Sequence, residues 1–69
     1  MGKSFWKRNF FVVRFCGKEI VKFEDKKKSN AMDSAISFAT QLHKVSNVPH
    51  EISVYSMESD TELLFLERV

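Results

Sequence analysis

The sequence predicts a small α+β domain in which a single antiparallel β-sheet carries one helix packed on one face. Short runs of β-branched and aromatic residues occupy the N-terminal part, the middle changes to helical spacing, and the last third returns to strand-like runs. The predicted order is strand-strand-helix-strand-strand. Because 69 residues leave no room for a second core, residues 1–69 are expected to form one domain.

The first strand is expected at NFFVVRF, residues 9–15. Successive strand residues point to opposite faces, which places Phe11, Val13 and Phe15 on one side. We assign this purely apolar set to the core. If the strand extends back toward the N-terminus, the other side carries a set that interleaves aromatic, aliphatic and cationic residues: Trp6, Arg8, Phe10, Val12 and Arg14.

The second strand is expected at EIVKFE, residues 19–24, but its register stays open. A two-residue turn at Cys16-Gly17 would direct Ile20 inward. A three-residue loop over residues 16–18 would instead direct Val21 and Phe23 inward. The position of the glycine favours the first register, whereas the hydrophobic pattern favours the second.

The spacing predicts an amphipathic helix over residues 31–45. Ser29 or Asn30 is expected to cap its N-terminus, with Asp33 adding a favourable charge in the first turn. Pro49 is expected to end the helical region. The apolar stripe is predicted to consist of Met32, Ala35, Ile36, Ala39 and Leu42.

A second hairpin is expected from residues 51–57 and 62–69. With it, the sheet has apolar residues on both faces, although one helix can cover only one of them. We expect the uncovered, outer face to carry Phe10, Val12, Leu64 and Leu66. At about 1.5–3 kcal/mol for each buried side chain of this kind, exposing four would forgo about 6–12 kcal/mol. Such a patch is rarely left in water. The N-terminal Phe5-Trp6 segment, a second copy packed sheet to sheet, or another macromolecule would cover it.

Catalytic, cofactor and metal chemistry are not expected. Gly2 and Gly17 form no glycine-rich loop, and Cys16, His43 and His50 are too few and wrongly spaced for a zinc site. We therefore expect no enzyme, no cofactor, no metal and no small-molecule substrate. A lone cysteine, the lack of a long apolar run and an N-terminus unlike a signal peptide lead us to expect a cytoplasmic protein rather than a membrane protein.

Charge is unevenly distributed along the chain, which points to a charged partner. Residues 1–28 carry nine Lys or Arg against three Asp or Glu, whereas residues 29–69 carry two against six. We expect a partner-binding site on the outer sheet face and a basic N-terminal hairpin, composed of Trp6, Arg8, Phe10, Val12, Arg14, Lys22, Lys26, Lys27 and Lys28. A protein partner or a homodimer is favoured. Nucleic acid is the alternative, although no RNP1-like run is present.

The general plan, a strand-strand-helix-strand-strand domain under 80 residues without a catalytic group, is similar to that of many small phage-encoded proteins. Those proteins bind and block host machinery such as polymerases or CRISPR effectors. The resemblance covers architecture only. It implies a non-enzymatic inhibitor or regulator that acts by binding a protein.

Overall fold

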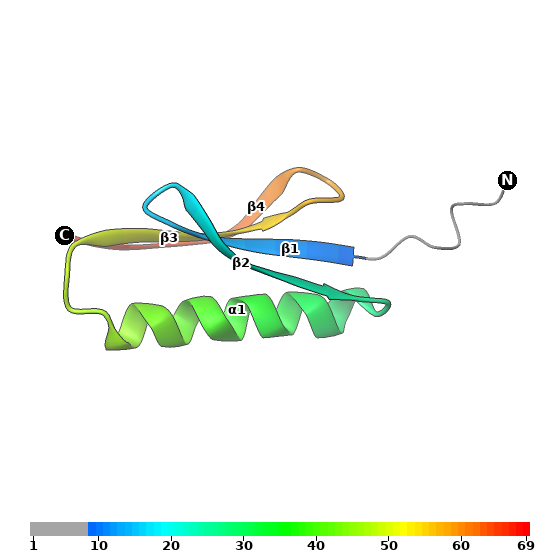
Figure 1. Cartoon of the computed structure of the whole chain (residues 1–69), viewed down its shortest axis with the longest axis horizontal. Coiled ribbons are helices and arrows are strands. Elements are labelled where there is room, and N and C mark those ends of the chain that lie inside the picture. The colour runs from blue at the N-terminus through cyan, green and yellow to red at the C-terminus, as the bar shows by residue number, and fades with distance from the viewer. Residues whose placement is uncertain (1–8) are drawn as a thin grey trace, which may run out of the picture.

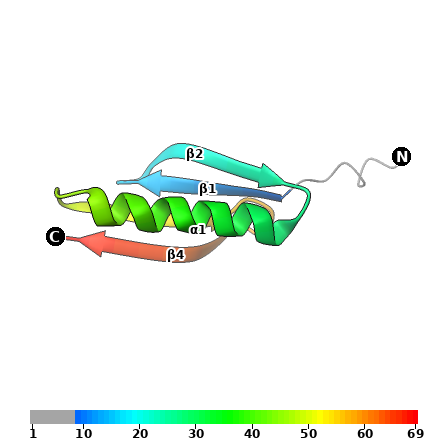
Figure 2. The same ribbon diagram turned by 90° about the horizontal axis from the view of Figure 1, so that it is seen from below.

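Four strands and one helix make up the structure, a computed structural model that describes residues 9–69. The elements are β1 (Asn9–Phe15), β2 (Lys18–Asp25), α1 (Lys28–Val45), β3 (His50–Ser56) and β4 (Thr61–Arg68). The strands form one antiparallel sheet in the order β2-β1-β3-β4, and α1 lies across one face of it (Figures 1 and 2). The predicted α+β class and element order are confirmed.

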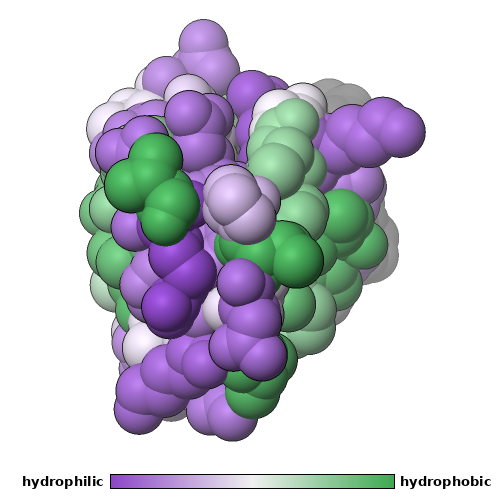
Figure 3. Space-filling model, turned by 90° about the vertical axis from the view of Figure 1, so that its left-hand side faces the viewer, coloured by the Kyte–Doolittle hydropathy of each residue, from purple (hydrophilic) through white to green (hydrophobic). Residues whose placement is uncertain are grey.

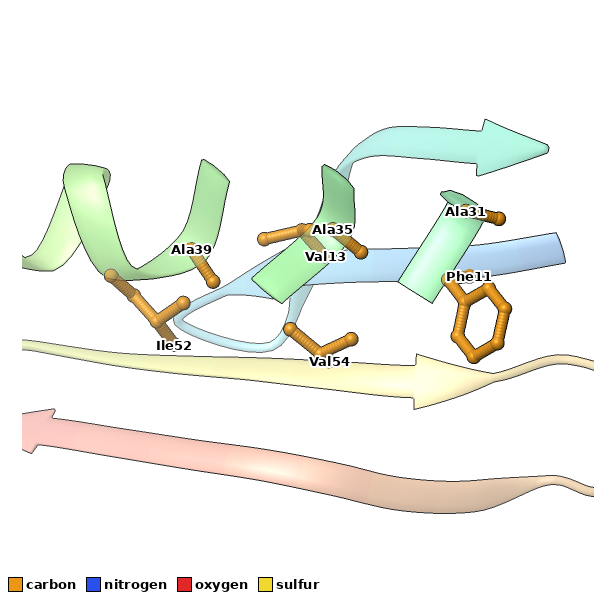
Figure 4. Packing of buried hydrophobic residues seen from close by; sticks show 7 residues of the cluster. All are labelled: Phe11, Val13, Ala31, Ala35, Ala39, Ile52 and Val54. Carbon is orange, nitrogen blue, oxygen red and sulfur yellow. The ribbon is translucent and has the colours of Figure 1, made fainter. Parts of the chain in front are cut away.

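Small residues on α1 allow the helix to lie close to the sheet. Ala31, Ala35 and Ala39 are spaced by four residues, share one side of the helix, and are almost completely buried. Figure 4 shows them facing the apolar side chains of the two central strands: Phe11, Val13, Ile52 and Val54. The helical stripe is therefore centred on alanines, so the larger sheet residues supply most of the core volume.

The turn between β1 and β2 is the tight two-residue form. Phe15 pairs directly with Lys18, and the two turn residues, Cys16 and Gly17, have φ angles of 53° and 84°. Positive φ at both central positions defines a type I′ turn, whose twist matches that of antiparallel strands. A cysteine adopts this conformation only with some strain, whereas glycine adopts it freely.

A β-bulge then restores the hydrophobic register. The pairing of β1 with β2 shifts between Val13 and Arg14, so that one extra residue, Ile20, is accommodated on β2. Beyond the bulge, Val21 lies opposite Val13 and packs against the core. The turn favoured by the glycine and the register favoured by the hydrophobic pattern therefore coexist, and Ile20 is left exposed.

The helix begins three residues earlier than predicted. It starts at Lys28, its N-cap residue is Lys27, and no side chain caps it, so the predicted capping by Ser29 or Asn30 and the first-turn charge are wrong. Instead, the Lys27 backbone N–H donates to the Asp25 carboxylate at 2.8 Å, directly at the end of β2. This contact turns the chain from strand into helix without a longer loop.

No helix within residues 9–69 combines the length and the apolar character that crossing a membrane requires.

Candidate protein-binding face

The face of the sheet that α1 leaves uncovered is the candidate site, and we call it the outer face. Strand alternation and pairing define its members, because residues directly opposite one another on neighbouring strands share a face. Val12, for example, pairs with Lys22 on β2 and with Tyr55 on β3. The outer face comprises Phe10, Val12, Arg14, Glu19, Lys22, Glu24, Glu51, Ser53, Tyr55, Glu62, Phe65 and Glu67.

Val12 lies at the centre of the outer face and is nevertheless only 1% exposed. Its neighbours across the strands are Lys22 and Tyr55, and its neighbours along β1 are Phe10 and Arg14. All four have long or aromatic side chains. They enclose the valine, so this apolar residue is shielded from water by its own face.

The four side chains around Val12 form two cation–π pairs. The Arg14 Cζ atom lies 4.4 Å from the centre of the Tyr55 ring, and the Lys22 Nζ atom lies 5.0 Å from the centre of the Phe10 ring. Contacts of this kind contribute about 0.5–1 kcal/mol at exposed sites. The pairs hold two rings and two positive charges in defined positions.

Tyr55 is also fixed by Glu62, the residue opposite it on β4. The tyrosine hydroxyl donates a hydrogen bond to the Glu62 carboxylate, and this bond, together with the negative charge of Glu62, raises the pKa of Tyr55. Partial burial acts in the same direction, while Arg14 opposes it. Tyr55 is therefore held as a neutral phenol whose ring faces the guanidinium.

The apolar content of the outer face differs from the expectation. Leu64 and Leu66 pack against the core beneath α1, because they pair with the buried residues Val54 and Ile52. Placing these leucines on the outer face was wrong. The residue of β4 that belongs to the outer face is Phe65, which pairs with Ser53 and is 49% exposed.

These positions also remove much of the predicted surplus of exposed apolar groups. Val12 is buried, Phe10 is half-buried, and the two leucines are part of the core. The expected apolar patch of Phe10, Val12, Leu64 and Leu66 is therefore not formed, and the Phe5-Trp6 segment that was one of its three expected covers lies outside the described residues. Any partner of the outer face binds a domain whose core is already closed.

The charged residues are distributed over the two hairpins differently from what the sequence predicted. The strands β1 and β2 with their turn carry three cationic and three anionic side chains, so the hairpin that we described as basic is balanced: Arg14, Lys18, Lys22, Glu19, Glu24 and Asp25. The β3–β4 hairpin carries one cationic side chain against five anionic ones: Arg68, Glu51, Glu58, Asp60, Glu62 and Glu67. One side of the sheet is therefore clearly acidic.

The predicted site residues are only partly brought together. Phe10, Val12, Arg14 and Lys22 gather on the outer face, as predicted. Trp6 and Arg8 lie outside the described residues. The remaining three are exposed and lie away from the outer face (Figure 1): Lys26 and Lys27 in the connection from β2 to α1, and Lys28 at the start of α1.

Sequence reasoning missed Tyr55, Glu62 and Phe65. The alternation of the third strand contained the signal for Tyr55, because Ile52 and Val54 mark the opposite side of that strand. Phe65 required the phase of β4, which is set by its pairing with β3 and interrupted by a bulge between Glu62 and Leu64. No local pattern in the sequence predicts that bulge.

A histidine pair joins the end of α1 to the start of β3. His50 is 3% exposed, and its Nδ1 atom lies 2.7 Å from the Val48 carbonyl oxygen. A carbonyl only accepts, so Nδ1 of His50 carries a proton, and its Nε2 atom shares a hydrogen bond with His43 Nδ1 at 2.9 Å. Burial lowers the pKa of His43, and the charge of Arg68 and the neighbouring His50 lower it further. This pair is a packed structural contact.

The end of the molecule beside this pair carries an open hollow of about 320 Å³. It is lined by Cys16, Pro49, His50, Glu51, Glu67, Arg68 and Val69. Figure 3 looks onto this end, where apolar groups are interleaved with hydrophilic ones. Within residues 9–69, no three potential metal ligands of the histidine, cysteine or carboxylate type lie close enough together to hold an ion.

Comparisons with protein-family models, with curated proteins and with solved structures find no match to this chain. The proposed function therefore rests on the chemistry and geometry of the outer face.

Proposed function

We propose that this chain is a small, non-enzymatic protein-binding module that holds a partner protein on the outer face, around Val12. The observation that supports this proposal is the pair of cation–π contacts, Arg14 with Tyr55 and Lys22 with Phe10, on the face that α1 leaves open. Tyrosine and arginine are among the residue types that contribute most at protein interfaces. Side chains already held in place lose less entropy on binding.

The charges of the outer face define the chemistry of the partner. Aromatic and cationic side chains lie at its centre, while the β3–β4 side adds Glu51, Glu62 and Glu67. A complementary surface has an apolar patch bordered on one side by lysine or arginine. We propose a folded protein with such a surface as the partner.

The chain would act by occupying a surface of its partner protein. A domain of this size without catalytic motifs acts most simply by blocking or positioning what it binds. This matches the expectation of an inhibitor or regulator, of the kind that small phage-encoded proteins provide against polymerases or CRISPR effectors.

Nucleic acid is the second candidate for the same face. The Tyr55 and Phe10 rings would stack on bases, and Arg14 would meet phosphate. Five carboxylates on the β3–β4 hairpin oppose this, because they repel a phosphate backbone on that side of the sheet. The charge distribution therefore favours protein over nucleic acid.

Site-specific photo-crosslinking tests the proposed face. A photoreactive amino acid is placed at Glu51 or Ser53 on the outer face, and at Ser37 or Gln41 on the exposed side of α1 as matched controls. In cells that express the chain naturally, the two outer-face positions should link to the same protein. The helix positions should not.

Linking from the helix positions alone, or no protein linked from the outer face, would contradict the proposal. A salt titration with single- and double-stranded oligonucleotides examines the second candidate. Binding through phosphate contacts weakens with a log–log slope of about −0.7 to −0.9 for each contact. Tight binding with such a slope, and no linked protein, would replace the protein partner by nucleic acid.

A further inference from the structure

The two borders of the sheet, β2 and β4, differ in how they are protected. A strand at the border presents unpaired backbone N–H and C=O groups, which can pair with a strand from another chain. Proteins commonly prevent this pairing with charged side chains, especially lysine, along the border strand. Both border strands here contain a bulge, so the regular stretches to compare are residues 21–25 of β2 and residues 64–68 of β4.

The β2 border is protected by charge and by contacts within the chain. Its regular stretch contains Lys22, Glu24 and Asp25, and Lys22 lies over the Phe10 ring. At the end of β2, the Asn9 side-chain amide donates to the backbone oxygen of Lys26 at 3.1 Å. These features make β2 a poor template for a further strand.

The β4 border carries charge only toward its two ends, at Glu62, Glu67 and Arg68, and its middle is unprotected. Four uncharged residues follow one another from Leu63 to Leu66, without lysine or proline anywhere in β4. Leu63 is 40% exposed and Phe65 is 49% exposed. Figure 2 shows β4 at the border of the sheet, with α1 lying over the interior strands, so the helix does not cover the outer side of β4.

We propose that β4 pairs antiparallel with β4 of a second copy, giving a two-fold dimer with a continuous eight-stranded sheet. The side-chain sequence of β4 is what points to a second copy. Residues that lie directly opposite each other in an antiparallel pair point to the same face of the sheet. Side chains alternate between the two faces along a strand, so core-facing residues stay opposite core-facing residues only if the two-fold axis passes through a residue and not between two residues. The candidates in the apolar part of β4 are Leu64, Phe65 and Leu66.

Only the register centred on Phe65 keeps apolar residues of the regular stretch together. It sets Phe65 opposite Phe65 of the second copy and Leu64 opposite Leu66. Toward the ends of the pair, at and beyond the bulge, Leu63 falls near Glu67 and Glu62 near Arg68. Centring on Leu64 sets Leu66 opposite Glu62. Centring on Leu66 sets Phe65 opposite Glu67. Aromatic and aliphatic cross-strand pairs stabilise antiparallel pairing, so the first register is preferred.

The acidic β3–β4 hairpins oppose this association, because each carries five carboxylates against one arginine. Salt screens such repulsion. We therefore expect the dimer to tighten as the salt concentration rises, opposite to the behaviour of a nucleic-acid complex. The dimer would align two outer faces on one side of a long sheet, so that one assembly presents two binding surfaces.

Analytical ultracentrifugation of the full chain over a wide concentration range tests the dimer. Wild type should show a monomer–dimer equilibrium, and Phe65→Lys should raise the dimer dissociation constant about tenfold or more, as loss of a central interface residue does. Ile20→Lys is the matched control, since Ile20 is an exposed apolar residue, 46% accessible, on the other border. It should leave the dimer unchanged. Circular dichroism confirms that each variant is folded.

Disulfide trapping identifies the paired strand through the gain of a covalent dimer and not through a loss of affinity. In a Cys16→Ser background, Phe65→Cys should form a covalent dimer under mild oxidation, because the two residues face each other across the two-fold axis. Ser53→Cys, one strand further in on the outer face, should not. A monomer at every concentration, a dimer indifferent to Phe65→Lys, or faster trapping through Ser53→Cys would overturn the proposal. A monomeric chain would leave the proposed partner binding on the outer face unaffected.

Discussion

Val12 illustrates how a valine on the uncovered face of a sheet becomes buried within a single chain. Lys22 and Arg14 are charged, yet their long aliphatic stems cover apolar surface while their charged ends reach the Phe10 and Tyr55 rings. An apolar residue on an outer strand face is thus no proof of a partner. What the outer face offers a partner is the set of ordered aromatic and cationic groups around the valine.

Replacing Val12 tests this enclosure. Val12→Ala should lower the free energy of unfolding by about 1–2 kcal/mol, because it removes buried methyl groups and leaves a small void. Val48→Ala is the matched control at a position that is 56% exposed, and its effect should be much smaller. Urea denaturation measures both. Equal effects at the two positions would show that Val12 is not enclosed as described.

The Tyr55–Glu62 contact predicts an unusual titration. Tyr55 is the one tyrosine of the chain, so ultraviolet absorbance follows its ionisation without ambiguity. Because the hydrogen bond and the charge of Glu62 raise the pKa of Tyr55, ionisation should occur above the usual value of 10.0. Glu62→Gln should move the transition back to lower pH. An unchanged transition in this variant would remove the contact from the account.

His43 predicts how stability depends on pH. Burial, Arg68 and His50 lower the pKa of His43 in the folded state, so near pH 6.5 the unfolded chain binds the proton more readily than the folded one does. The stabilising contribution is complete above pH 6.5 and is lost as the pH falls below it. Urea denaturation of wild type should show declining stability from pH 7 to pH 5.5.

His43→Gln provides the comparison for that pH dependence. The variant should be less stable at pH 8, because the hydrogen bond between His43 and His50 is lost, and its stability should change less between pH 7 and pH 5.5. Wild-type stability that stays constant or rises as the pH falls would contradict the assigned direction of the shift.

At the scale of elements, the β1–β2 hairpin shows where sequence reasoning succeeds and where it stops. The glycine position and the hydrophobic pattern of residues 18–25 favour different registers. The glycine correctly predicts the two-residue turn, and the hydrophobic pattern correctly predicts that Val21 and Phe23 face the core. The bulge between Val13 and Arg14 reconciles them. A bulge cannot be recognised in a single sequence. It leaves only one extra residue without a partner on the neighbouring strand, and its position depends on how the whole sheet packs.

Two substitutions in the turn should change stability in opposite directions. Cys16→Asn should stabilise the protein by about 0.5–1 kcal/mol, because Asn-Gly is the preferred pair for a type I′ turn. Gly17→Ala should destabilise it by about 1–2 kcal/mol through backbone strain at φ 84° alone, since no atom lies within 4 Å of the added carbon. Thermal unfolding measures both changes. The same sign for both would contradict the turn type.

The helix shows a second limit of sequence reasoning. Its existence and its buried side were predictable from spacing, but its start was not. Ser29 and Asn30 are good capping residues that lie inside α1, because the carboxylate of Asp25, two residues before Lys27, binds the Lys27 N–H first. A local contact at the end of β2 therefore sets the start of the helix ahead of both expected capping residues.

At the scale of the whole molecule, the α+β class, the order of elements and four outer-face residues follow from the sequence alone. The phase of β4 does not, and it determines whether Leu64 and Leu66 or Phe65 belong to the outer face. The distribution of charge was also only half predictable. The acidic β3–β4 hairpin is evident in the sequence, whereas the balance within β1–β2 depends on where the strands end.

The most direct measurement of the central claim is the affinity of the crosslinked partner, once purified, for variants of the two faces. Arg14→Ala and Tyr55→Ala, which remove the two members of one cation–π pair, should each weaken binding about tenfold or more. Ser37→Ala and Gln41→Ala on the exposed side of α1 should change it little. If the helix variants weaken binding while Arg14→Ala and Tyr55→Ala leave it intact, the outer face is not the working surface of this protein.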